Sequence, residues 1–170
     1  MKLYTGKIPI IAAEITRSLI NENDIEVSDH EEVEKDVEAI LREYIRVERL
    51  IDEEAKDRIS RMGLTYSDFA KAKRLVAKQK NFGIGDEAIT YIIQQLIECF
   101  MHSSNVEEVF SDDQALTVRI RNVLRKHMGI DDEIEKEVRS KIKHVEDGTR
   151  EWEVEYEKVR EETKRKLKLT

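Results

Sequence analysis

A long amphipathic run constrains the fold of this chain more than any other feature. Over residues 29–62, apolar residues recur at steps of three and four, the spacing of one face of an α-helix. Ser28 and Glu31 have the spacing of an N-terminal capping box, and Gly63 suits the end of a helix. The sequence therefore predicts one long helix, which needs a partner along its apolar stripe.

The same pattern returns in the second half of the chain. Ser111 and Gln114 repeat the capping box and open a second predicted helix over 111–145, with His127 at the position of Tyr44. Any two amphipathic helices align in phase, but the shared capping boxes favour an internal duplication. Identical residues in the two runs are Leu41/Leu124, Arg42/Arg125, Ile51/Ile134, Glu54/Glu137 and Ile59/Ile142.

The composition and the repeated pattern together predict an all-α fold of about six helices. Charged residues make up 39% of the chain, against 6 Gly and 1 Pro, which favours long solvated helices. A shorter apolar helix and a polar loop precede each long helix, so each half is a short–long hairpin. The predicted units are 1–62 (first helical repeat), 63–85 (basic connecting helix), 86–145 (second helical repeat) and 146–170 (C-terminal helix, whose end is expected to fray).

No catalytic, cofactor-binding or metal-binding residue is predicted. The chain lacks the glycine-rich phosphate-binding motifs and the nucleophile elbow. Cys99 is the single cysteine, and its apolar neighbours indicate a buried small side chain. Glu98 and His102 could supply two metal ligands, but they lie at a helix end and are expected to face solvent. His127 is expected to pack at a seam between helices.

The N-terminal apolar run is too short and too interrupted for a signal peptide or a membrane anchor. With one cysteine, we expect a cytoplasmic protein without a membrane partner. The abundance of Lys, Arg and Glu is also typical of thermophile proteins.

Charge is unevenly distributed along the chain, whose net charge is −7. The connecting segment concentrates basic residues, and the following segment, 86–110, carries five acids and neither Lys nor Arg. The connector could bind nucleic acid or another anionic partner, or it could neutralise the acidic helices it packs on; the overall acidity favours neutralisation. The candidate anion contacts are Lys71, Lys73, Arg74, Lys78 and Lys80.

The two long helices are expected to extend beyond a compact core, because a helix of about 34 residues is about 50 Å long. Their projecting halves carry apolar residues that solvent does not tolerate uncovered. The C-terminal helix could cover one stripe through Trp152, Tyr156 and Val159, and we expect a homodimer to cover the rest. The candidate partner interface is Ile51, Ile59, Met62, Ile134, Ile142 and Val145.

The segments "MKLYTGKIPIIAAEITRSLI" and "EVEKDVEAILREYIRVERLIDEEAKDRI" resemble a bacterial family known as domain of unknown function 507. The resemblance lies in the lysine-initiated start, the Ile and Ala spacing of the first helix and the Glu-rich second helix. It implies a helical, cytoplasmic bacterial protein and brings no catalytic residue, cofactor or substrate. The sequence thus favours a noncatalytic helical protein–protein interaction or structural module, with nucleic-acid or anionic-partner binding through 71–80 as the alternative.

Overall fold

A computed structural model of the chain describes residues 2–146 and 149–169. These residues form seven α-helices and one two-stranded sheet, which confirms the all-α class. Single turns of 3-10 helix lie at Thr5–Lys7, Tyr66–Asp68 and Gly85–Glu87. In chain order the other elements are α1 (Ile8–Asn21), β1 (Ile25–Val27), α2 (His30–Arg61), α3 (Phe69–Gln79), α4 (Ala88–His102), β2 (Val106–Val109), α5 (Asp113–Met128), α6 (Ile130–Lys141) and α7 (Arg150–Lys166).

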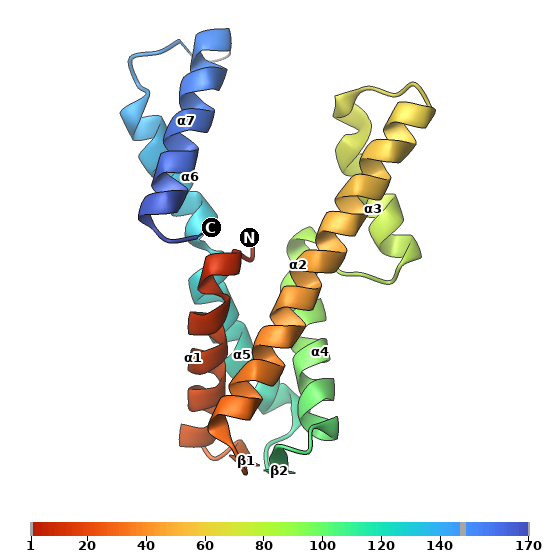
Figure 1. Ribbon diagram of the computed structural model, residues 1–170, viewed down its shortest axis with the longest axis vertical. Coiled ribbons are helices and arrows are strands. Elements are labelled where there is room, and N and C mark those ends of the chain that lie inside the picture. Colours follow the sequence, from red (N-terminus) through yellow and green to blue (C-terminus); the bar gives the residue numbers. More distant parts are fainter. Residues whose placement is uncertain (1, 147–148, 170) are drawn as a thin grey trace.

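The helices form a base and two diverging arms (Figure 1). In the base, α1 packs against α2 and α5, and α4 packs against α5 and α2, with the strands at the lower end. The upper half of α2 continues beyond the base and packs with α3 to form one arm, which we call the α2–α3 arm. Helices α6 and α7 form the other arm, beside which the two chain ends meet.

Two hydrophobic cores stabilise this shape. The larger core fills the base and continues between α2 and α3, where Ile51, Val76 and Phe82 are buried. The smaller core lies between α6 and α7 and is closed by residues near both chain ends. Its buried members are Tyr4, Ile134, Val138, Ile142, Val159 and Leu169. Each arm therefore has apolar contacts of its own.

Equivalent positions of the two predicted long helices are buried in pairs, one member on α2 and the other on α5 or the stretch that follows it. The order of elements is also alike in the two halves, since helix, strand, long helical stretch and covering helix follow each other twice. A common origin of the halves would produce this arrangement and stays a prediction. The buried pairs are Val33/Leu116, Val37/Ile120, Leu41/Leu124, Tyr44/His127, Ile51/Ile134, Ala55/Val138 and Ile59/Ile142.

The second long helix is interrupted, unlike the first. The prediction for 29–62 agrees with α2, but the predicted helix over 111–145 is divided at Gly129 into α5 and α6. Glycine is a poor residue for a helix interior, and the Gly129 N–H still bonds the Arg125 carbonyl at 3.1 Å. The partners that the apolar stripes require are shorter helices: α2 packs mainly on α1, α3 and α4, and α6 packs on α7.

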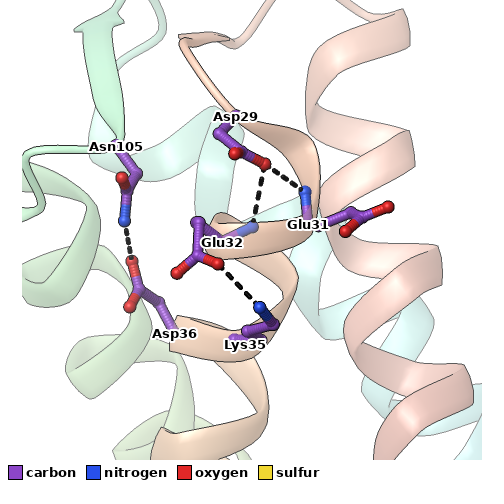
Figure 2. A network of polar contacts seen from close by, with 6 residues as sticks. All are labelled: Asp29, Glu31, Glu32, Lys35, Asp36 and Asn105. Carbon is purple, nitrogen blue, oxygen red and sulfur yellow. Dashed lines mark hydrogen bonds and ion pairs between the residues drawn. The ribbon is translucent and has the colours of Figure 1, made fainter.

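The cap of α2 lies one residue after the predicted serine (Figure 2). The Asp29 carboxylate accepts the backbone N–H groups of Glu31 at 3.0 Å and Glu32 at 3.2 Å. The Ser28 hydroxyl instead donates to the Asn105 carbonyl at 3.2 Å, in the chain just before β2. An aspartate caps a helix as well as a serine does, which leaves Ser28 to join the two halves of the chain.

The start of α5 repeats this arrangement. Asp112 is the cap and accepts the Ala115 N–H at 2.8 Å. The Ser111 hydroxyl, predicted as the cap, donates to the buried Asp24 carboxylate at 2.6 Å, and Arg119 pairs with the same carboxylate. Both predicted capping serines therefore bond to the opposite half of the chain.

Two segments predicted as irregular depart from that expectation. The loops before the long helices form β1 and β2, which pair antiparallel with Ile25 opposite Val109. The C-terminal end does not fray, because Leu169 is 1% exposed and its carbonyl accepts the Gly6 N–H at 3.2 Å. Among the residues described, no helix has the length and apolar character needed to cross a membrane.

Candidate interaction surface

The basic connector forms α3, and its cations divide into two groups. Lys73 faces α2, where its ammonium lies 2.9 Å from the Asp52 carboxylate and 3.4 Å from that of Glu48. Burial alone would lower the pKa of Lys73, but the two carboxylates outweigh it and raise the pKa. Lys80 pairs with Glu54 of α2 at 3.1 Å. These two cations neutralise the helix that α3 covers.

The other three cations of the connector lie on the opposite face of α3. Lys71, Arg74 and Lys78 are spaced i, i+3 and i+7, which places them within about 60° of one another around a helix with about 100° per residue. All three are exposed, and none has an ion-pair partner among the described residues. The face that they share points away from Val76 and the core.

The tip of the same arm exposes large apolar side chains. Met62, Leu64 and Tyr66 follow the end of α2 and are 69%, 44% and 79% exposed. The Tyr66 ring stacks on that of Phe69 at 5.7 Å, which supports it at the start of α3. A capping box on Thr65 holds the turn between the two helices. We call these three exposed side chains, with Lys71, Arg74 and Lys78, the arm surface.

Sequence reasoning found Met62 and the cations but missed Leu64 and Tyr66. The available signal was their position, because apolar residues between a helix-ending glycine and a capping threonine belong to neither helix. An apolar residue in a short exposed turn has no core face to pack into.

Most residues of the predicted partner interface are buried inside the chain. Ile51 and Ile59 lie under α3, and Ile134 and Ile142 lie under α7, all at most 8% exposed. Val145 is half-buried. One covering helix was expected, whereas the structure has two, so the premise that two stripes stay uncovered within one chain is wrong. Of the six residues, Met62 alone is a largely exposed side chain.

A cavity of about 1290 Å³ lies at the base of the arm, between α3 and the start of α4. Phe82 and Tyr91 line it, and their ring centroids are 4.7 Å apart. Phe82 also stacks on Tyr44 at 4.8 Å, and the Tyr44 hydroxyl donates to the Gly83 carbonyl at 3.0 Å. Burial raises the pKa of Tyr44, which keeps this hydroxyl protonated. The packed rings of Tyr44, Phe82 and Tyr91 thus fix the position of residues 82 and 83 in the cavity lining.

Gly83 is required by the same packing. A Cβ atom at this position would lie 2.6 Å from the Tyr91 Cβ and 2.8 Å from the Glu87 carbonyl oxygen. Such distances are well inside van der Waals contact, so no larger residue fits without moving α4. The close approach of residues 82–84 to α4 thus depends on the missing side chain.

A second hollow, of about 640 Å³, contains the side chains considered above for catalysis and metal binding. Cys99, His102 and Asp36 line it. The Asp36 carboxylate accepts a hydrogen bond from the Ser103 hydroxyl at 2.8 Å. It also accepts one from the Asn105 side-chain amide at 3.3 Å (Figure 2). Burial, and then the Asp36 charge, raise the pKa of the Cys99 thiol. No group of three or more His, Cys, Asp or Glu able to hold a metal ion occurs in the part of the chain that is described.

His127 lies at the seam between α1 and α5, as predicted. It is 9% exposed, and its Nε2 lies 2.6 Å from the Glu14 carboxylate, which also binds Lys126 at 2.7 Å. Burial alone would raise the pKa of Glu14, but the bonds to Lys126 and His127 outweigh it and lower the pKa. This cluster joins α1 and α5.

The model of a family described as a protein of unknown function, DUF507, matches residues 1–169. Among curated proteins, none matches the chain.

Proposed function

The chain belongs to the DUF507 family. We propose that it is a noncatalytic helical interaction module. We further propose that the arm surface is its binding site and that it binds an acidic segment of a partner protein. This function rests on one observation: the unpaired cations of α3 and the exposed apolar tip lie on the same projecting arm of the described chain.

The chemistry of the arm surface favours a protein partner. Residues 63–85 contain one acid, Asp68, whose carboxylate accepts hydrogen bonds from Thr65, so an acidic segment meets little repulsion along α3. Exposed Met62, Leu64 and Tyr66 would bury apolar area against such a segment, and aromatic and Met side chains are enriched at interfaces. Nucleic acid is the weaker candidate, because binding through phosphates needs more cations than three and gains little from apolar side chains.

The noncatalytic part of the proposal has separate support. The sequence carries no phosphate-binding or nucleophile motif. The pKa of the Cys99 thiol is raised, whereas a nucleophilic cysteine needs a lowered one. Both observations favour binding over bond-breaking chemistry.

Selection from a random peptide library displayed on phage tests this function. The immobilised chain is expected to enrich peptides that combine Asp or Glu with large apolar residues. Synthetic copies should bind at least tenfold more weakly to a Lys71→Glu, Arg74→Glu, Lys78→Glu variant and to a Met62→Ser, Tyr66→Ser variant, since each removes one half of the surface. Fluorescence anisotropy measures both affinities.

Matched controls lie elsewhere on the molecule. Arg17→Glu and Lys158→Glu change exposed cations outside the arm, and Val154→Ser removes a side chain that is 61% exposed on α7. These variants should bind the peptides as the parent chain does. Enriched peptides that bind the charge-reversed variant equally well would contradict the proposal. Salt-sensitive binding of duplex DNA without peptide binding would replace it with nucleic-acid recognition.

A further inference from the structure

The cavity at the base of the α2–α3 arm has the features of a small-molecule site. It is a hollow of about 1290 Å³ that is open at the surface between α3 and residues 85–87, so a ligand can enter it. Ala77, Phe82 and Gly83 are buried residues of its lining, and Ile84 and Tyr91 are half-buried. Ile84 and Tyr91 are therefore apolar side chains of the cavity that a ligand can reach.

This apolar part is preorganised. Phe82 is held between the Tyr44 and Tyr91 rings, with centroid distances of 4.8 and 4.7 Å. The Tyr44 hydroxyl fixes the adjoining Gly83 carbonyl at 3.0 Å. A ligand that contacts the half-buried Tyr91 ring would not have to order this ring first, which lowers the cost of binding.

The charges of the cavity are separated between its two sides. On the α3 side are Lys73, Arg74 and Lys78, of which Lys73 is engaged with α2 while Arg74 and Lys78 have no ion-pair partner among the described residues. Asp86 and Glu87 lie on the other side. An anionic group fits beside Arg74 and Lys78, but a ligand with negative charge along its whole length would meet the two acids.

We propose that this cavity binds a small amphiphile with one carboxylate and an apolar body. The carboxylate contacts Arg74 and Lys78, and the apolar body lies against the half-buried Ile84 and Tyr91. Polar side chains at Asn81, Thr90 and Gln94 also line the cavity and suit the boundary with solvent. This site shares Arg74 and Lys78 with the arm surface but uses neither Lys71 nor the apolar tip.

Laurate is the probe, and isothermal titration calorimetry at concentrations below micelle formation measures its affinity. One laurate per chain should bind. An Arg74→Glu, Lys78→Glu variant should bind at least tenfold more weakly, because it reverses the charge beside the carboxylate. The matched control is Lys71→Glu, which changes an exposed cation of the same helix outside the cavity lining and should stay within twofold of the parent. Lauryl alcohol, which lacks the charge, should bind at least tenfold more weakly than laurate.

A blocking variant provides a second measurement. Thr90 is exposed and lines the cavity, so Thr90→Trp should narrow it without disturbing the core, and should weaken laurate binding. Circular dichroism confirms that each variant is folded. The proposal is overturned if laurate does not bind, if Lys71→Glu weakens binding as much as the double variant does, or if Thr90→Trp binds normally. If the parent chain binds laurate but the library selection yields no binding peptide, the proposed function alone is contradicted.

Discussion

Single polar side chains join elements that are far apart in the sequence. Tyr44 and His127 occupy equivalent positions of the two halves and are both buried, yet they make different bonds. Tyr44 donates to the Gly83 carbonyl next to the cavity, whereas His127 meets the Glu14 carboxylate between α1 and α5. Each bond satisfies a buried polar group that would otherwise cost about 1–3 kcal/mol. Equivalent positions of the repeated pattern thus make contacts with different parts of the chain, Tyr44 with Gly83 and His127 with Glu14.

Glu14 makes the stability of the α1–α5 seam depend on pH. Its pKa is lowered from the ordinary 4.5 in the folded chain, so its stabilising contribution is present above that value and is lost as pH falls through the lower folded pKa. Glu14→Gln should lower the free energy of unfolding by about 1–2 kcal/mol at pH 7. In urea unfolding, this difference from the parent chain should shrink at pH 3.

The control for this prediction is Glu107→Gln, which changes an exposed carboxylate on β2 and should have little effect at either pH. An equal loss of stability for Glu14→Gln at pH 7 and pH 3 would mean that the carboxylate charge does not matter.

At the scale of elements, α3 and α7 perform the same task. Each is a charged helix that covers one half of a longer helical stretch, α3 over Ile51 and Ile59 and α7 over Ile134 and Ile142. The basic residues of the connector dominate its sequence, but α3 also has an apolar face that covers α2. Its buried Val76 and Ala77 provide that face.

Ile51 tests whether α3 covers α2 within the chain. It is fully buried, while the neighbouring Leu50 is 45% exposed on the same helix. Ile51→Ala should lower the free energy of unfolding by about 2–5 kcal/mol, because it removes a buried side chain and leaves a cavity. Leu50→Ala should change it by less than about 0.5 kcal/mol. Similar effects of the two substitutions in urea unfolding would contradict the packing of α3 on α2.

At the scale of the whole molecule, two arms diverge from one base (Figure 1). An open shape of this kind exposes more surface than a compact domain of equal length. Both apolar stripes are nevertheless covered inside the chain, so no extended apolar stripe of α2 or α6 among the described residues calls for a second copy.

Sedimentation equilibrium should therefore give the mass of one chain, 20.0 kDa, up to high protein concentration. A mass of two chains would instead support the homodimer expected from the sequence. The arm tip would then be the first place to look for the interface, and a Met62→Glu, Leu64→Glu variant should restore the single-chain mass. Ile59 and Ile142 are unsuitable for this test, because a charge at either buried position would unfold the arm.

Local patterns in the sequence were enough for the fold class, the span of α2 and the residues that face the core. Helix hydrogen bonds join residues four apart, so spacing and caps predict a helix from neighbouring residues alone. The pairs at 33/116, 37/120 and 41/124 are buried as their phase requires. The family also followed from local segments and is confirmed by the match over 1–169.

Tertiary contacts decided the rest. The pairing of Lys73 and Lys80 with α2 and the strands formed from two polar loops depend on which elements meet in space. Periodicity shows which face of a helix is apolar but not which helix covers it. Helix α3 covers part of α2, and the cavity lies between α3 and the start of α4. Such contacts join residues distant in the sequence, and only the folded chain determines them.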